Sequence, residues 1–182
     1  VAKSFVYDAL GRVVRQTESG NVVGGTQSRT TSFSYDAVGN LLATFDPLGN
    51  DERFEYDRLN RVVKSIAPDP DGAGLQAAVV TTTEYDAAGR VIRQTDALGN
   101  VDRTIYDTRG RVVRTIDPLG EEIRRRYDAA GNLTAFIDSA GNVTAYTYDR
   151  ADRLTSETNA SGTKTYEYDA RDRVVGLTQT ID

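Results

Sequence analysis

The stretch YDAAGRVIRQTDALGN, residues 85–100, contains two short turn signals separated by residues that favour β-strands. Asp86 and Asp96 each begin a four-residue segment that ends in glycine. An Asp carboxylate can accept a bond from a backbone amide two residues later, and glycine adopts positive φ without steric cost. The intervening residues 90–95 are enough for a strand and too few for a helix. This stretch therefore predicts a β-hairpin.

The Tyr-Asp pair at the start of the stretch recurs along the whole chain. Four copies, beginning at Tyr85, are 21 residues apart, and the next step is 20. A fixed period of this length indicates a repeat architecture. We expect residues 1–182 to form one array of about eight repeats of ~21 residues, truncated at both ends. The copies are Tyr7-Asp8, Tyr35-Asp36, Tyr56-Asp57, Tyr85-Asp86, Tyr106-Asp107, Tyr127-Asp128, Tyr148-Asp149 and Tyr168-Asp169.

The third residue after each of these aspartates is always Gly, Asn or Asp. These are the residue types that enter the left-handed backbone region at least cost. The pattern is typical of a type I turn closed by a residue with positive φ. Since the substitutions follow conformation, we interpret them as structural. The positions are Gly11, Gly39, Asn60, Gly89, Gly110, Gly131, Asp152 and Asp172.

A second turn signal follows about half a repeat after each Tyr-Asp turn, as in Asp46-Pro47-Leu48-Gly49 and Asp117-Pro118-Leu119-Gly120. Proline in the second position and glycine in the fourth suit a type I turn. From Asp86 onward the turn-leading residues are 10 or 11 apart, which leaves strands of six or seven residues. We therefore predict an all-β fold: a curved, open antiparallel meander of about sixteen strands and virtually no helix.

One face of this sheet should carry the tyrosines and the aliphatic residues that begin each first strand, and we expect that face to be buried, though thinly. Two insertions, near residues 20–32 and 67–76, interrupt the period at second turns. Both should form loops at one rim. A β-propeller, with two repeats in each four-stranded blade, is the alternative architecture, but the insertions do not recur at a blade period.

Composition excludes several classes of function. The formal charge is −5, which disfavours nucleic acid and anionic membranes as partners, and no apolar run reaches the ~20 residues of a membrane helix. Cysteine and histidine are absent, which excludes Ser-His-Asp and Cys-His catalysis and typical zinc sites. The evenly spaced carboxylates lead turns, so we predict no catalytic, metal or cofactor site.

Two further clusters have a simpler interpretation. Asp69-Pro70-Asp71-Gly72 resembles the start of a calcium loop but lacks the closing glutamate, so a solvated loop is favoured. The arginines around Arg124-Arg125-Arg126 could form a basic stripe. Pairing across strands with carboxylates such as Glu122 is the favoured interpretation.

The motif Y-D-x-x-G-[RN]-[VL], followed by T-x-D-x-x-G-N, resembles the YD repeats of the Rhs family, and it covers essentially the whole chain. That family includes bacterial Rhs proteins, the B and C subunits of insecticidal toxin complexes, wall-associated proteins and teneurins. The departures are Asn60, Asp152 and Asp172 at the glycine position and the two insertions. The resemblance implies a sheet that spirals into a hollow shell.

The resemblance implies a non-catalytic scaffold, part of the shell of a large secreted or surface protein of a bacterium that encloses or presents a toxin domain. The partners would be the rest of the shell and an enclosed C-terminal domain. The alternative is a carbohydrate-binding or adhesion array with a carbohydrate or protein ligand, and it predicts exposed tyrosines where the scaffold predicts buried ones. The strand edges near both ends could also pair with another copy.

Overall fold

The computed structural model describes residues 2–22, 25–69 and 78–181, which form sixteen β-strands and no helix. They fall into two units, residues 1–100 and 101–182. The first contains β1 (Ala2–Tyr7), β2 (Val13–Val22), β3 (Gly25–Tyr35), β4 (Leu41–Phe45), β5 (Asp51–Tyr56), β6 (Val62–Ile66), β7 (Val80–Tyr85) and β8 (Val91–Thr95). The second contains β9 (Val101–Tyr106), β10 (Val112–Ile116), β11 (Glu122–Tyr127), β12 (Leu133–Ile137), β13 (Val143–Tyr148), β14 (Leu154–Asn159), β15 (Gly162–Tyr168) and β16 (Val174–Thr180).

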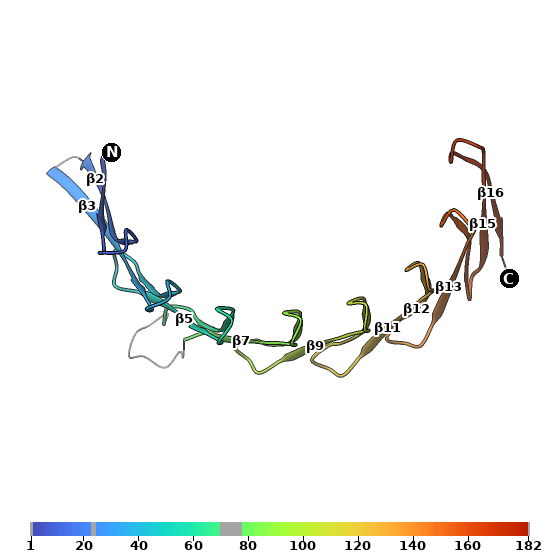
Figure 1. The fold of residues 1–182 in the computed structure, drawn as a ribbon, viewed down its shortest axis with the longest axis horizontal. Helices are drawn as coiled ribbons and strands as arrows, with labels where there is room; N and C mark the ends of the chain where they lie inside the picture. Colours follow the sequence, from blue (N-terminus) through green and yellow to red (C-terminus); the bar gives the residue numbers. More distant parts are fainter. Residues whose placement is uncertain (1, 23–24, 70–77, 182) are drawn as a thin grey trace. The chain divides into compact units, whose positions relative to one another are not determined.

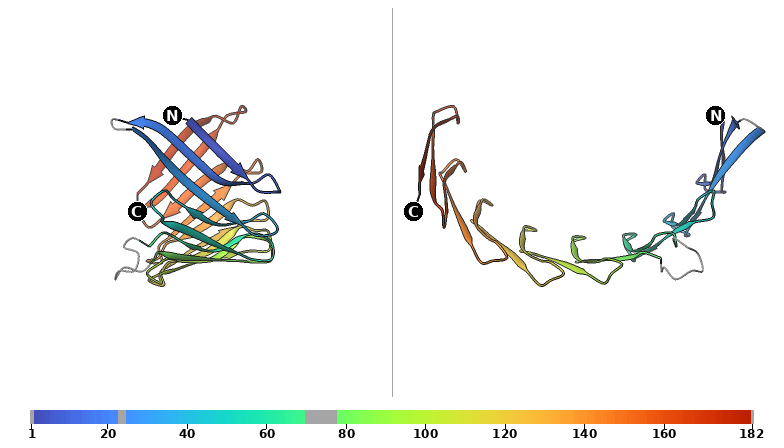
Figure 2. Two further views of the ribbon diagram at one scale, coloured as in Figure 1. Left: turned by 90° about the vertical axis from the view of Figure 1, so that its left-hand side faces the viewer. Right: turned by 180° about the vertical axis from the view of Figure 1, so that it is seen from behind.

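In each unit every strand pairs antiparallel with its neighbours in sequence, in the orders β1 to β8 and β9 to β16 (Figure 1). The strands of each unit lie side by side in a single layer (Figure 2). Strands β4 and β5 are paired, as are β12 and β13, so neither unit is divided into four-stranded blades. The all-β meander is confirmed and the propeller alternative is wrong.

The Tyr-Asp turns have the conformation that the sequence predicts. All eight left-handed positions have positive φ, including 59° at Asn60, 59° at Asp152 and 62° at Asp172. In the turn that begins at Asp86, the Gly89 amide donates to the Asp86 carbonyl at 3.0 Å and the Asp86 amide to the Arg90 carbonyl at 2.9 Å. A register shift accompanies the turn at Glu84/Tyr85, as a bulge next to a left-handed residue requires.

The first insertion is not a loop, contrary to the prediction. It lengthens a hairpin, because β2 has 10 residues and β3 has 11, paired from Arg15↔Ser32 to Val22↔Gly25. The inserted segment is rich in Thr and Ser, which suit strands and form cross-strand hydroxyl pairs such as Thr17 with Thr30 at 3.1 Å.

The second insertion is described only at its borders. The Ala67 amide donates to the Val79 carbonyl at 2.9 Å, which continues the pairing of β6 with β7. Residues 70–77 lie outside the described residues. The predicted loop and most of the calcium-like segment Asp69-Pro70-Asp71-Gly72 therefore remain predictions.

The single layer has almost no core. Among the described residues only one hydrophobic side chain is buried, Ala43 at 6% exposure. Thr44 pairs with Phe33, which lies on the tyrosine face of the sheet. Because side chains alternate along β4, Ala43 lies on the other face. The predicted burial of the tyrosine face is met only in part: seven of the eight motif tyrosines are half-buried and Tyr7 is exposed. Contacts between repeats must replace a core.

Candidate functional site

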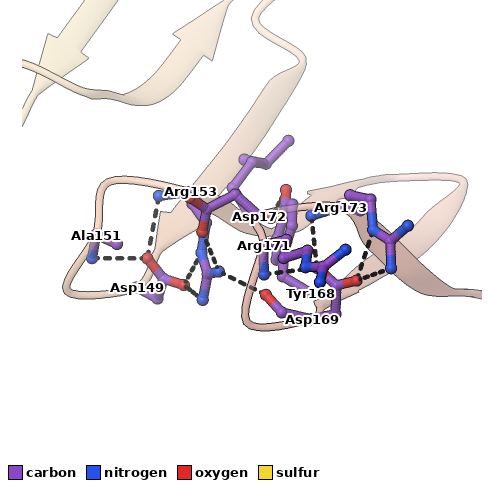
Figure 3. A network of polar contacts seen from close by, with 9 residues as sticks. Asp149, Ala151, Arg153, Tyr168, Asp169, Arg171, Asp172 and Arg173 are labelled. Atoms are coloured by element: carbon purple, nitrogen blue, oxygen red, sulfur yellow. Dashed lines mark hydrogen bonds and ion pairs between the residues drawn. The ribbon is translucent and has the colours of Figure 1, made fainter.

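Each Tyr-Asp turn is organised around its aspartate, and the turn at Asp149 is an example (Figure 3). Asp149 Oδ1 accepts the amides of Ala151 and Arg153 at 2.8 and 3.1 Å, and Oδ2 accepts Arg153 Nε at 2.7 Å. Both carboxylate oxygens are therefore engaged inside the turn. The same set of bonds occurs at Asp8, Asp57, Asp86, Asp107 and Asp169.

These bonds hold the carboxylates in their ionised form. The side-chain hydrogen bond from Arg153, supported by its backbone amide, lowers the pKa of Asp149. At Asp8 the backbone amide of Arg12 is the largest cause of the lowered pKa. A carboxylate with a lowered pKa and both oxygens occupied is poorly suited to act as a general acid or base near neutral pH. The geometry favours a structural role for the motif.

The arginine of one Tyr-Asp turn also reaches the next turn along the chain. The Arg111 guanidinium lies over the Tyr127 ring, 4.6 Å from its centroid, and its Nη1 donates to the Asp128 carbonyl at 3.1 Å. We call this arrangement the inter-turn contact: an arginine on the next tyrosine ring and on the next aspartate's carbonyl. It recurs from Arg12 to Tyr35 and Asp36, from Arg61 to Tyr85 and Asp86, and from Arg153 to Tyr168 and Asp169.

The tyrosine hydroxyl completes the connection between repeats. Tyr127 Oη donates to the Val112 carbonyl at 3.0 Å, so the ring is fixed against the preceding repeat by both its face and its hydroxyl. The accepting residue, Val112, lies at the register shift at the start of β10. Equivalent bonds run from Tyr35 to Val13, Tyr56 to Leu41, Tyr85 to Val62, Tyr148 to Leu133 and Tyr168 to Leu154.

Two turns carry asparagine where the others carry arginine, and there the contact takes another form. Asn132 Nδ2 donates to its own Asp128 at 3.2 Å and to Asp152 of the next turn at 2.7 Å. Asn40 likewise donates to Asp36 and, at 2.8 Å, to Asn60. Because asparagine is too short to reach the next backbone carbonyl, the next turn supplies a side-chain acceptor. Arg153 also uses such an acceptor, Asp172, at 2.7 Å.

This corrects the interpretation of Asn60, Asp152 and Asp172 as purely conformational substitutes for glycine. Each has positive φ, and each also accepts a hydrogen bond from the preceding Tyr-Asp turn. The signal was present in the sequence, since Asn40 and Asn132 precede Asn60 and Asp152 by 20 residues, nearly one repeat. The sequence gives no comparable signal that links Arg153 to Asp172, because the other arginines of the Tyr-Asp turns are followed by glycine at this position.

The second turns have the same internal bonds. Asp138 Oδ1 accepts the Asn142 amide at 2.8 Å, and its Oδ2 accepts Asn142 Nδ2 at 2.8 Å. Asp46 with Asn50 and Asp96 with Asn100 repeat this pattern. Their apolar residues point to solvent: Leu48, Leu98 and Leu119 are 85–87% exposed.

The arginine cluster confirms the favoured interpretation only in part. Arg114 of β10 and Glu122 of β11 form an ion pair across the strands at 3.2 Å, whereas Arg124 binds Glu122 within β11 at 2.6 Å. Arg125 instead lies over the Phe136 ring, at 5.6 Å from its centroid. The described residues contain no cluster of three metal-binding side chains, and no helix among them is long and apolar enough to cross a membrane.

Known structures share this fold. The chain resembles a TcdB2–TccC3–Cdc42 crystal structure with a TM-score of 0.63 and 19% identity over 96% of this chain. It resembles a Photorhabdus luminescens Tc holotoxin pore structure with a TM-score of 0.61 and 19% identity over 94% of this chain. The chain spans 11% of the length of either of those chains. At these identities the similarity concerns the fold alone.

The RHS Repeat family model matches four segments of the sequence, residues 35–73, 85–122, 127–164 and 150–180. These segments cover more than half of the chain and contain seven of the eight Tyr-Asp turns. The recurring motif, the unbroken meander in each unit and the sequence match agree, and the chain belongs to the RHS repeat family.

Proposed function

We propose that this chain is a non-catalytic scaffold, a segment of the hollow β-shell of a large secreted or surface protein that encloses or presents a toxin domain. The inter-turn contact is the observation that carries the proposal. In this contact the arginine side chain and the tyrosine hydroxyl of the motif bond to neighbouring repeats, as at Arg111, Tyr127 and Asp128. Such a repeat adds length and rigidity to a wall. Family membership and the shared fold support the same role.

A single-layered wall suits a container because it encloses volume with little protein. In an ordinary domain, apolar burial supplies most of the favourable free energy. Here the described residues bury one hydrophobic side chain, and the linear order of strands in each unit lets further repeats be added without changing earlier ones. We expect the sheet to continue into more repeats and to spiral around its cargo.

The experiment that tests the shell is performed on the full protein from which the segment comes. We expect electron microscopy to show a closed hollow particle, and limited proteolysis to spare the enclosed domain until the shell is unfolded. An extended ribbon, or a toxin domain cleaved at the same rate in the intact and unfolded protein, would contradict the proposal.

Carbohydrate binding is the rival, since regular tyrosines can act as stacking platforms for sugars. The half-buried tyrosines match neither prediction fully, but a ring covered by Arg111 on one face and bonded through its hydroxyl is a poor platform. Because the chain has no tryptophan, tyrosine fluorescence reports directly on these rings. We expect no change on titration with a panel of oligosaccharides. A saturable change that is lost in Tyr127→Phe would support the rival.

A further inference from the structure

The face of strands β9, β10 and β11 that lies opposite the motif tyrosines carries an excess of positive charge. Residues paired directly across strands share a face, as do alternate residues along a strand. The register therefore places four arginines and one glutamate on this face. Within the described stretch 101–127, these strands put no other charged side chain there. We call the five residues the arginine patch: Arg103, Arg114, Glu122, Arg124 and Arg126.

Glu122 balances only part of this charge. Its two oxygens already accept Arg124 Nε and Nη2, at 2.9 and 2.6 Å, and Arg114 Nη1, at 3.2 Å. Arg103 and Arg126 are exposed, and neither side chain forms an ion pair or a hydrogen bond with another residue that the structure describes. Four arginines against one glutamate leave an excess of three positive charges, in a chain whose formal charge is −5.

The same face of β5–β8, in the first unit, shows that the repeat does not require such an excess. Every cation of those four strands lies on this face and forms an ion pair with a carboxylate that also lies there. The pairs are Arg53 with Asp51, Lys64 with Glu55 and Arg93 with Glu84. Mixed signs of this kind are usual on a solvated face. The arginine patch departs from the pattern and therefore calls for carboxylates from elsewhere.

Apolar side chains lie among the arginines of the patch. Directly paired across the strands are Arg103 with Ile116, Arg114 with Ile105 and Arg124 with Ile137. All three isoleucines are half-buried, so part of each contacts solvent. A depression at the second-turn rim of this face is lined by Glu122, Arg124 and Ile137 together with Leu119. A molecule that covers this surface well must supply both anionic and apolar groups.

An acidic stretch of polypeptide meets both requirements, whereas a long polyanion does not. Aspartates lead the turns at both ends of these strands, Asp107 and Asp128 at one rim and Asp117 and Asp138 at the other. A nucleic acid or a sulfated polysaccharide that crosses the sheet passes over these carboxylates, which repel it. It also offers no aliphatic group to the isoleucines. A short peptide segment can remain between the rims and carry carboxylates and aliphatic side chains together.

We propose that the arginine patch binds an acidic polypeptide segment of a partner protein. Carboxylates of the segment pair with Arg103 and Arg126, whose guanidinium forks are free to accept them in bidentate geometry. Its aliphatic side chains lie against Ile116 and Ile137. This surface belongs to β9–β12 alone, so the proposal holds whether or not the whole protein closes into a shell.

Binding of a fluorescent peptide, followed by anisotropy, tests the proposal. The peptide alternates glutamate and valine with serine between them. Its affinity should fall as salt is raised. Arg103→Ala together with Arg126→Ala should weaken binding about ten-fold, because two exposed ion pairs are lost. The matched control is Arg150→Ala with Arg171→Ala, which removes the same charge from exposed turn residues of the same unit and should change affinity little.

The sign of the charge gives a second readout. All four of these arginines are exposed, so each variant should keep the circular dichroism spectrum of the wild type. Arg103→Glu with Arg126→Glu should lose the glutamate peptide and bind the equivalent lysine peptide. No binding of the glutamate peptide to the wild type, or equal losses in the patch and control variants, would overturn the proposal.

Two comparisons test the class of partner. A peptide with serine in place of valine should bind more weakly, because it leaves Ile116 and Ile137 uncovered. A single-stranded oligonucleotide and a sulfated polysaccharide of equal charge should also bind more weakly. If either binds as tightly as the valine peptide and depends equally on Arg103 and Arg126, the patch is a general anion site and the assignment to an acidic polypeptide is wrong.

Alkylation of introduced cysteines locates the bound peptide, and the chain has no native cysteine to interfere. Ile105→Cys lies on the patch face beside Arg114, and Thr104→Cys lies on the tyrosine face. The glutamate–valine peptide should slow alkylation of Ile105→Cys and leave Thr104→Cys unchanged. Protection of Thr104→Cys alone, or equal protection of both, would place the peptide elsewhere and contradict the proposal.

Discussion

Two turns flank β12, one that begins at Asp128 and one that begins at Asp138. Each aspartate accepts the backbone amide and the side-chain amide of an asparagine four residues later. Their surroundings differ. Asn132 extends to Asp152 of the next repeat and the Asp128 carbonyl receives Arg111, whereas the described hydrogen bonds of Asn142 end on Asp138.

The same turn chemistry therefore serves two purposes. At the second turns it reverses the chain, and apolar side chains such as Leu119 remain in solvent. At the Tyr-Asp turns it also joins one repeat to the next through a ring, a guanidinium and a hydroxyl. In a sheet with almost no core, this difference predicts that stability depends much more on one rim than on the other.

The largest difference between the rims should appear at their large side chains. Tyr127→Ala should destabilise the chain by about 2–4 kcal/mol, because it removes a half-buried ring, its stacked cation and its hydroxyl bond. Leu119→Ala should change the free energy of unfolding by less than about 0.5 kcal/mol, since Leu119 is 85% exposed. Urea denaturation measures both. Equal losses would remove the distinction between the rims.

Backbone strain should affect the two rims alike. Gly89 and Gly99 have φ of 84° and 83°, so Gly89→Val and Gly99→Val should each cost about 1–3 kcal/mol, because a β-branched residue is forced to positive φ. Ala87→Val, at the tip of the same turn as Gly89, is the control and should cost much less. A melt in which Ala87→Val matches Gly89→Val would show that positive φ does not limit this turn.

Acid should weaken both kinds of turn. Side-chain hydrogen bonds from Arg61 and Asn100, together with backbone amides, lower the pKa of Asp57 and Asp96 below the ordinary value of 3.8. The folded chain then binds fewer protons than the unfolded chain. The stabilisation is complete above the unfolded pKa and is lost as pH falls through the lowered folded pKa. Urea midpoints should hold from pH 7 to 5 and fall below about pH 4. A midpoint unchanged down to pH 3 would contradict this.

The asparagine form of the contact should give the smallest effect. Asn40→Ala and Asn60→Gly together should show a coupling of about 0.5–1 kcal/mol, the range for one neutral hydrogen bond at a partly exposed site. Asn50→Ala combined with Asn60→Gly is the control and should be additive, because Asn50 bonds to Asp46. If the Asn40 and Asn60 effects are also additive, the side-chain acceptor contributes nothing.

The turns and strands were predictable from the sequence because the information for them is local. An aspartate followed three residues later by Gly, Asn or Asp specifies a turn by itself, and the spacing fixes strand length. The loop prediction for the first insertion is wrong because extra length between two turns can also extend a hairpin, and residues 26–32 are polar residues compatible with strands.

The contacts between repeats were harder to predict, because they join an arginine side chain to a backbone carbonyl about 16 to 25 residues away. The tyrosines were expected to be buried in a face. Instead they are fixed by Arg12, Arg61, Arg111 and Arg153 and by carbonyls of the preceding repeat. Only the pairing of Asn40 with Asn60, and of Asn132 with Asp152, left a visible trace in the sequence.

The central claim is that the inter-turn contact holds the repeats together, and a double-mutant cycle on Arg111 and Tyr127 tests it most directly. The single variants Arg111→Ala and Tyr127→Ala and the double variant are compared by urea denaturation. We predict a coupling of about 1–2 kcal/mol, as for a partly buried cation on a ring. A parallel cycle on Arg114 and Tyr127 should give none, because Arg114 binds Glu122. Additive effects of Arg111→Ala and Tyr127→Ala would contradict the account.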